Sequence, residues 1–538
     1  MKTRYIALAI SLFVSLSGIA QHNEEVTIEG TYRPKVNKVD KILMQPVKPQ
    51  QSFEMPGTEV RVLDIEHRFQ HELEKMSPLY YNGSNGQMPE AAKNFLMAGF
   101  GSRISPVFLY KHNSNLTKNL GLGVGIKHYS SWLDIKDYAP TSFMNNAFNV
   151  GLTSSKYKNV QLGWEVYYKN DMYHYYGFDP QQVYNTIGTS FGLTSTTTRN
   201  GEFVNDLNID YHYLFGKLDG GGKEHSAKLS YDLGYVDSWW GKKNYPQKLG
   251  LALGAQYAND QFPGQAGEDH LIFKVNPYFE MKDDFYRLHL GVRMDGTTDF
   301  VTTTGMLSVH PDLKGSLSVI DNAVEFYAGL NGGRKLFTYS DMITDNPFVD
   351  TRLNMEVTTV KLGFEGGIRT HLMKTMDIHV GVRYRHTDND PFFHEVSATT
   401  AKPYNSFDVV YDETRTVSVM GNVRWLATDK MVVDAAFTYN NYKMTNEAHP
   451  WFRPGLEGDV KLSYRFTDAF GMNANFLYQG QRWAMNDVFD LGLGADWHVN
   501  DQLTVFAKLN NMANQKYQLY YDYPVGGIQA FAGLKIRF

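Results

Sequence analysis

The 538-residue sequence contains no cysteine. It therefore forms no disulfide and offers no Cys-ligated zinc or iron–sulfur site, no Cys nucleophile and no lipid-modified N-terminal Cys. Beyond the N-terminus no run of about 18 apolar residues occurs, so no transmembrane helix is expected. Asp and Glu (57) outnumber Lys and Arg (52), which excludes the basic composition of a nucleic-acid-binding protein.

Aromatic residues and glycine are abundant. Phe, Trp and Tyr make up 14% of the chain, with 35 Tyr and 33 Phe, and there are 47 Gly. Charged residues, at 20%, fall below the roughly 25% of ordinary soluble domains. A Tyr- and Gly-rich chain without cysteine or long apolar runs is typical of an outer-membrane β-barrel.

The N-terminus predicts export from the cytoplasm. Residues 1–20 have the pattern of a secretory signal peptide: Lys2 and Arg4 precede an apolar stretch, and the small residues Gly18 and Ala20 precede a cleavage site before Gln21. A signal anchor is the alternative. Residues 21–92 are polar and rich in proline, so they are predicted to be a periplasmic or lumenal segment that depends on a partner or on the barrel for order.

From residue 93 onward the chain alternates with period two. In residues 160–168, Val160, Leu162, Trp164, Val166 and Tyr168 alternate with polar or small residues. Short polar turns recur at 155–158, 198–201, 282–284, 320–322, 373–375, 428–430, 467–469 and 500–502. With these turns and both termini in the periplasm, the strand number is even. The prediction is all-β: a transmembrane antiparallel barrel of about 22 strands over residues 93–538, with 18 or 20 strands as alternatives.

The last strand supports this fold. Leu534, Ile536 and the terminal Phe538 fall on one face, and Lys535 and Arg537 fall on the other. An amphipathic closing strand that ends in an aromatic residue is the signal expected by the barrel-assembly machinery. Outer-membrane lipid and this machinery are therefore predicted partners, and the cell outer membrane is the predicted location.

The C-terminal stretch also resembles TonB-dependent outer-membrane receptors. VFAKLNNMANQKY (505–517) is similar to that family's penultimate strand and loop entry, and GGIQAFAGLKIRF (526–538) is similar to its closing strand. EVTIEGTYRP (25–34) is similar to its N-terminal lead-in. The whole looks most like short, plug-poor members from Bacteroidota, and the resemblance implies 22 strands and a role in transport.

The chain departs from this family in having no recognisable plug. Only residues 21–92 lie between the cleavage site and the first strand, whereas the family's plug is about twice as long. A 22-stranded barrel has a wide lumen, so residues 21–92, inward loops or another protein must close it. The longest extracellular connections are predicted at 336–352 and 389–404.

Candidate site residues follow from this arrangement. Glu25, Val26, Thr27 and Ile28 could pair with TonB by adding a strand to it, or could be part of a disordered leader. The predicted lumen-lining residues, which would tune the passage of a polar solute, are Glu165, Asp206, Asp210, Lys274, Arg293, Arg383 and Lys535.

Other patterns in the sequence have simpler explanations than a binding or metal site. Two aromatic groups, residues 173–178 and the tyrosines of 517–523, are predicted to belong to the interfacial girdle rather than to a binding surface. The oxygen-rich stretches 344–347 and 388–391 fit Asx turns better than Ca²⁺ sites. No metal site, cofactor, nucleic-acid partner or enzyme activity is predicted.

Two functions remain open. The first is a TonB-dependent-receptor-like barrel that mediates or gates solute transport across the outer membrane, with TonB as a partner. The second is a plugless structural subunit that scaffolds a multiprotein outer-membrane complex, with another outer-membrane or periplasmic protein closing the lumen.

Overall fold

The computed structural model describes residues 93–538 except 158, 180, 196–199, 241–244, 299–306, 321–322, 373–374 and 398–403. The predicted signal peptide, the segment 21–92 and the TonB-contact candidates Glu25, Val26, Thr27 and Ile28 lie outside these residues. The first described strand begins at Asn94, next to the predicted boundary at 93.

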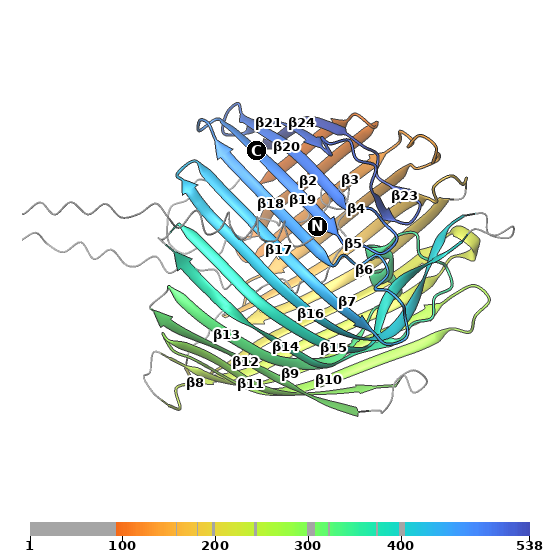
Figure 1. Cartoon of the computed structure of the whole chain (residues 1–538). Helices are drawn as coiled ribbons and strands as arrows, with labels where there is room; N and C mark the ends of the chain where they lie inside the picture. Colours follow the sequence, from red (N-terminus) through yellow and green to blue (C-terminus); the bar gives the residue numbers. More distant parts are fainter. Residues whose placement is uncertain are drawn as a thin grey trace, which may run out of the picture. The chain divides into compact units, whose positions relative to one another are not determined.

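The described chain forms one closed barrel of 22 antiparallel strands (Figure 1). The barrel strands are β1 (Asn94–Gly101), β2 (Ser105–Thr117), β3 (Leu120–Ser131), β4 (Phe143–Ser154), β5 (Val160–His174), β6 (Gln181–Ser195), β7 (Glu202–Gly216), β8 (Lys223–Asp237), β9 (Gln247–Gln261), β10 (Glu268–Lys282), β11 (Tyr286–Thr297), β12 (Leu307–Ile320), β13 (Val324–Leu336), β14 (Val357–Leu372), β15 (Met376–Val396), β16 (Ser406–Thr428), β17 (Met431–Met444), β18 (Leu456–Arg465), β19 (Phe470–Gly480), β20 (Val488–His498), β21 (Leu503–Asn510) and β24 (Gln529–Arg537). The connections contain η1 (Leu218–Gly220), α3 (Tyr339–Asp345), β22 (Gln518–Tyr520) and β23 (Tyr523–Pro524).

Each barrel strand pairs with its neighbours in the sequence, and the first strand closes on the last. In the register of β1 with β24, Phe95 lies opposite Arg537 and Gly101 lies opposite Phe531. Two backbone hydrogen bonds join Asn94 and Phe538, at 2.8 and 3.1 Å. Closure leaves no unpaired edge, as a barrel in lipid requires. The predicted strand number and topology are therefore confirmed.

The outer face carries the apolar residues of the alternating pattern. Trp164, Val166 and Tyr168 are exposed along β5, and Val380 and Val382 are exposed along β15. Exposed aromatic residues mark the strand ends near the termini: Trp240, Phe285, Trp425, Phe466, Trp497 and Phe538. Because apolar side chains on the outside are favourable only in a bilayer, the protein is an outer-membrane barrel. Among the described residues no helix is long and apolar enough to cross a membrane.

The two ends of the barrel differ. The predicted short turns all fall at the end that holds Asn94 and Phe538, which we call the periplasmic end. Longer connections lie at the opposite, extracellular end (Figure 1). The loop predicted at 336–352 is present as residues 337–356. The loop predicted at 389–404 is wrong in part, because β15 continues to Val396, through a register shift between Thr387 and Asp390.

Candidate functional site: a closed lumen above a basic cavity

The connection between β13 and β14, residues 337–356, packs against lumen-facing side chains of the barrel wall, and we call it the lid. It contains the helix α3, which begins with a capping box. The Thr338 hydroxyl accepts a hydrogen bond from the Asp341 amide at 3.3 Å, and the Asp341 carboxylate accepts one from the Thr338 amide at 3.1 Å. Pro347 follows shortly after the helix. Because proline has no amide proton, it cannot continue the backbone hydrogen bonds of the helix.

One face of the lid is apolar and buried. Tyr339, Met342 and Ile343 lie on one side of α3 because they are spaced by three and four residues. They pack with the wall residues Tyr184 of β6 and Leu214 of β7, and with others of the same buried cluster: Phe262, Val349, Leu353, Met355 and Val409. Burial of these side chains holds the lid against the wall.

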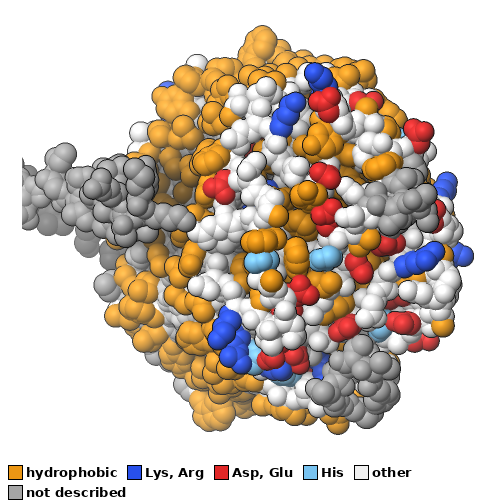
Figure 2. Space-filling model, turned by 45° about the vertical axis from the view of Figure 1, so that its right-hand side comes forward, with side chains coloured by type: hydrophobic (Ala, Val, Ile, Leu, Met, Phe, Trp, Pro, Cys, Tyr) orange, Lys and Arg blue, Asp and Glu red, His pale blue; other side chains and the backbone are white. Residues whose placement is uncertain are grey.

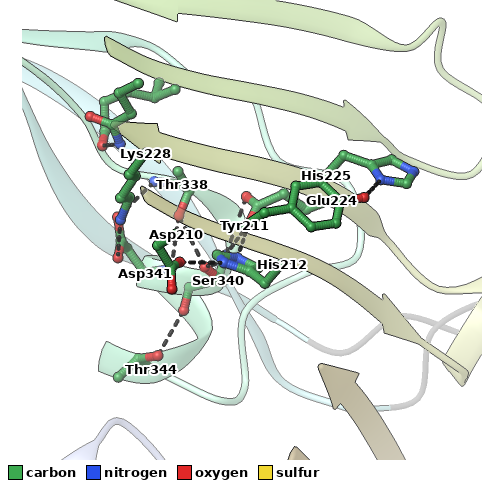
Figure 3. Close-up of polar contacts among 12 residues, drawn as sticks. Asp210, Tyr211, His212, Glu224, His225, Lys228, Thr338, Ser340, Asp341 and Thr344 are labelled. Carbon is green, nitrogen blue, oxygen red and sulfur yellow. Dashed lines mark hydrogen bonds and ion pairs between the residues drawn. The ribbon is translucent and has the colours of Figure 1, made fainter. Parts of the chain in front are cut away.

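A polar contact also joins α3 to the wall, and we call it the clasp (Figure 3). The Glu224 carboxylate on β8 is fully buried, and its Oε1 lies 3.1 Å from His212 Nε2 on β7. The same His212 nitrogen lies 3.0 Å from the Ser340 hydroxyl, and the Ser340 amide donates to Glu224 at 3.4 Å. Lys228 Nζ forms an ion pair with Asp341 at 3.6 Å. Polar groups that lose water on burial are thus paired with one another.

A second buried group, which we call the closure cluster, brings together residues from different sides of the barrel mouth. Its seven members are Tyr175, Phe348, Tyr404, Phe407, Phe452, Tyr520 and Tyr523. The rings of Phe348 and Tyr523 stack with centroids 3.8 Å apart, and those of Tyr175 and Tyr404 stack at 4.3 Å. Tyr175 follows β5, Phe348 belongs to the lid, and Tyr520 and Tyr523 lie in β22 and β23. The other three lie between β15 and β18, so the contacts join connections from separate parts of the barrel mouth. In Figure 2 the coloured side chains of the face that is drawn leave no wide opening between them.

Phenol hydroxyls of this region donate to backbone carbonyls of neighbouring loops. Tyr523 donates to Asn405 O at 2.7 Å, Tyr520 to Asp345 O at 2.5 Å and Tyr175 to Val349 O at 3.2 Å. Burial raises the pKa of the Tyr175, Tyr339 and Tyr523 phenols well above the ordinary value of about 10. Tyr175 and Tyr523 therefore stay neutral hydrogen-bond donors at physiological pH.

Below the lid lies a cavity of about 1760 Å³, lined mainly by the lumen-facing side of β1 to β10 and by β24. The part of the barrel wall that lines the cavity includes glycines, such as Gly123 opposite Gly151 and Gly163 opposite Gly192. Glycine keeps the wall smooth and the space wide, since no side chain projects from it. Nothing lies within 4 Å of the position that a Cβ of residue 163 would occupy.

The charged residues of the cavity are mostly basic. Nine Lys and Arg side chains line it: Lys93, Lys111, Lys118, Lys127, Lys228, Lys274, Arg334, Lys535 and Arg537. Among the described residues, two carboxylates, Glu165 and Asp210, line it with them. Lys228 and Asp210 also belong to the surroundings of the clasp: Lys228 pairs with Asp341, and Asp210 Oδ1 lies 3.6 Å from His212 Nδ1. The cavity and the lid therefore share side chains.

The structure brings four of the predicted lumen-lining residues together in this cavity: Glu165, Asp210, Lys274 and Lys535. Arg293 lies beside its upper edge and donates to the Arg334 carbonyl at 2.8 Å. Asp206 is on β7 and accepts from Asn208 at 3.1 Å. Arg383 is on the distant strand β15, 3.6 Å from Glu365. The last two do not line the cavity.

The remaining predicted residues are at the barrel seam. Leu534 and Phe538 are exposed on the outer face, and Ile536 shares that face by alternation. Phe531, on the other face of β24, is buried in the lumen with Met97 and Tyr129.

Sequence reasoning missed the lid and the closure cluster. The assignment of residues 173–178 and of Tyr517, Tyr520 and Tyr523 to the interfacial girdle is wrong, because most of these aromatics are buried in loop contacts. The sequence signal for the closure cluster was the high density of aromatic residues in the loops. An interfacial girdle gives the same signal, so the sequence alone does not separate the two. The Asx turn expected in 344–347 is present, since Asn346 Oδ1 accepts from the Phe348 amide at 3.0 Å. The stretch 388–391 instead lies inside β15.

The described residues contain no group of three or more His, Asp and Glu side chains arranged to hold a metal ion. The close contacts of His212 with Glu224 and Ser340 are explained by the attachment of the lid. The arrangement as a whole can do two things: close the extracellular mouth, and offer a charged, water-accessible space beneath it.

No protein-family model matches the sequence, and no curated protein matches it. Solved structures do match. The ferric-catecholate import receptor Fiu from E. coli K12 aligns with a TM-score of 0.62 at 9% identity, over 84% of this chain and 82% of that one. The siderophore receptor PirA from Acinetobacter baumannii gives 0.64 at 10%, over 84% and 81%. The pyoverdine outer-membrane receptor FpvA from Pseudomonas aeruginosa PAO1 gives 0.63 at 12%, over 84% and 79%. At these identities the similarity shows the fold, and the resemblance to TonB-dependent receptors is confirmed at that level.

Proposed function

We propose that this barrel, which has the fold of TonB-dependent siderophore and metal receptors, is a transport protein of the outer membrane whose extracellular mouth is gated by its own lid. The lid must leave the closure cluster for a solute to pass. The lumen-lining residues Glu165, Asp210, Lys274 and Lys535, together with Asp206, Arg293 and Arg383, would tune which polar solute passes.

The observation that carries this proposal is the combination of a closed mouth and a large space lined by charged residues below it. A barrel that only served as a scaffold would need no cavity lined by charged residues. One side chain, Lys228, both lines the cavity and forms an ion pair with Asp341 of the lid. Such sharing is what a gate that responds to the contents of its lumen requires.

The N-terminal segment completes the proposal. Residues 21–92 act as a reduced gate at the periplasmic side, and Glu25, Val26, Thr27 and Ile28 add a strand to TonB. TonB would then supply the force that moves the segment. This part rests on the sequence, because these residues lie outside the described ones.

One observation favours the second candidate, a structural subunit of a multiprotein complex. The mouth is closed by buried aromatic contacts and buried hydrogen bonds, which also suits a permanent seal. A scaffold of this kind would use its outer surface and its periplasmic end to hold partners, and neither TonB nor lid opening would matter to it.

Deletion of residues 21–29 separates the two candidates. The transport proposal predicts that the full-length protein binds the purified periplasmic domain of TonB, and that the deletion abolishes this binding while barrel assembly stays normal. The scaffold candidate predicts no TonB binding by either protein. Heat-modifiable mobility on a gel verifies that both barrels are folded, so that a failed assembly is not mistaken for lost binding.

A further inference from the structure

Two acidic side chains are buried next to each other at the extracellular end of the barrel wall, and we call them the carboxyl pair. Glu224 is the second residue of β8 and Asp260 is the last but one of β9, and the two are direct partners in the register of these strands. Side chains of direct partners are neighbours on one face of a sheet. Their exposed fractions are 0% and 1%.

The lid helix begins against the carboxyl pair. The Ser340 amide lies 3.4 Å from both carboxyl oxygens of Glu224. Two residues after Asp260, the ring of Phe262 meets the ring of Tyr339 edge-on, with centroids 5.2 Å apart. Tyr339 and Ser340 form the first turn of α3. Because both carboxyls are buried beside this turn, movement of the lid away from the wall exposes them to water.

The carboxyl pair lies above the lipid-facing band of the wall. Tyr257 is the last apolar residue on the outer face of β9, and the next two outward positions, Asn259 and Gln261, are polar. Asn259 donates a hydrogen bond to Asp269 of β10 at 3.0 Å. Asp260, between these two polar positions, is therefore outside the part of the strand that spans the membrane.

Asp260 lacks the partners that a buried carboxylate needs. Among the described residues, no group donates a hydrogen bond to either of its carboxyl oxygens. His270 Nε2 on β10 lies 4.0 Å from Asp260 Oδ2 and is nearer to the exposed Glu268, at 3.7 Å. Glu224, by contrast, lies 3.1 Å from His212 Nε2. Burial raises the pKa of Asp260 well above its usual range, and the Glu224 carboxylate beside it acts in the same direction.

The charged groups around the pair leave the proton on Asp260. The titratable groups that face the pair from neighbouring elements are His212 and Asp210 of β7, His270 and Glu268 of β10, Tyr339 of α3 and Tyr411 of β16. Lys228 and Asp341 pair with each other at 3.6 Å. Among the described residues, no Lys or Arg forms an ion pair with Glu224 or Asp260. His212 can balance one carboxylate, and the second carboxyl is stable in the closed lid only when it is neutral.

We propose that the carboxyl pair makes the lid sensitive to pH: Asp260 holds a proton while the lid is closed and releases it to water when the lid opens. The proposal deepens the proposed function and rests on it, since it names what regulates the gate. In the open lid both carboxyls are hydrated, and an aspartate then has an ordinary pKa of about 4.

The direction of the effect follows from proton linkage. Between the ordinary pKa of the open lid and the raised pKa of the closed lid, the closed lid binds one proton more than the open lid. Each unit of pH in this range therefore raises the open-to-closed ratio about tenfold. The lid is held closed in acid and is released as pH rises.

The test measures hydrogen exchange of the Met342 amide in the full-length protein in a neutral detergent. The observed rate at each pH is divided by the intrinsic rate of an unprotected amide at the same pH, which gives a protection factor that reports lid opening. The wild-type protection factor is expected to fall between about pH 5 and 8.

Two matched variants assign the effect. Asp260→Asn keeps the shape of the side chain, stays neutral and can donate to Glu224. We expect it to match the wild type near pH 5 and to be more protected near pH 8, by up to about a thousandfold. Asp269→Asn makes the same change to an exposed carboxylate on the outer face of β10, where Tyr257 donates to it at 2.7 Å. This control should follow the wild type at every pH.

The lower part of the range decides the question if Asp260→Asn fails to assemble. Histidine has an ordinary pKa of about 6.5 and is largely protonated between about pH 5 and 6 whether the lid is open or closed. A fall in wild-type protection within this interval therefore comes from a carboxyl.

Two results would overturn the proposal: a wild-type protection factor that stays constant between about pH 5 and 6, or the same pH dependence in Asp260→Asn as in the wild type. An equal effect of Asp269→Asn would also assign the proton to another place. None of these results changes TonB binding or the expected loosening of the lid by changes at its aromatic contacts, so failure here is distinct from failure of the proposed transport function.

Discussion

Phe348 is the residue through which the closure of the mouth can be measured. Its side chain is only 8% exposed and contacts four tyrosine rings, of which Tyr523 stacks at 3.8 Å and Tyr176 lies edge-on at 5.8 Å. Truncating a buried Phe to Ala costs about 3–5 kcal/mol when the surroundings cannot collapse. Because loops relax and water can enter at the barrel mouth, we take the lower limit, about 3 kcal/mol.

That loss acts on the equilibrium between the closed and open lid. At about 1.4 kcal/mol per factor of ten, 3 kcal/mol raises the open-to-closed ratio about a hundredfold. The assay is hydrogen exchange of the α3 amides, for example Met342, whose amide donates to the Thr338 carbonyl at 3.0 Å in the closed lid. Phe348→Ala should accelerate this exchange by about two orders of magnitude.

The matched control is Phe100→Ala. Phe100 lies on the outer face of β1 and is 58% exposed, so its loss should not change exchange in α3. If Phe348→Ala changes α3 exchange by less than about threefold, the closure cluster does not hold the lid closed.

Further predictions concern the clasp, the helix, pH and assembly. Glu224→Ala leaves His212 and the Ser340 amide without their buried acceptor and should destabilise lid closure by about 1.5–3 kcal/mol, measured as faster α3 exchange. Thr338→Ala removes the capping box and should cost about 1 kcal/mol in the same assay, whereas Thr338→Ser should cost little. The raised pKa of the buried tyrosines favours the closed lid equally at every pH below about 10, the value of an open-state phenol, and this contribution is lost as pH rises further. Proteolysis of the lid should therefore increase above about pH 10. Deletion of Phe538 should lower the yield of folded barrel in the membrane, seen by heat-modifiable mobility, and Phe538→Trp should restore it.

The barrel was predictable because its signal is repeated and local. Alternation such as that of residues 160–168 recurs in strand after strand, and a shift of one residue would turn every apolar side chain away from lipid. Short turns and the seam residues Leu534 and Phe538 then determine strand count and closure.

The lid was not predictable in the same way. Helix α3 is short, and its burial depends on Tyr184 and Leu214, which are more than a hundred residues away in sequence. The aromatic residues of the closure cluster could equally have formed a girdle, since both roles place Tyr and Phe at strand ends. The charged residues that face the lumen could be recognised in the sequence as polar positions of the alternating pattern. Which of these residues lie close together could not be recognised. Which of them share a cavity depends on how the strands close around the lumen, so Arg383 falls far from Lys274.

The conductance of the purified full-length protein in a planar bilayer tests the central claim most directly, namely that the lid closes the lumen. We expect no steady current from the unmodified protein, and channel openings from Phe348→Ala, whose lid is loosened. A large, steady conductance of the unmodified protein would contradict the claim outright. Silence of Phe348→Ala even after residues 21–92, the proposed periplasmic gate, are deleted would contradict it as well, because the seal would then lie elsewhere than in the lid.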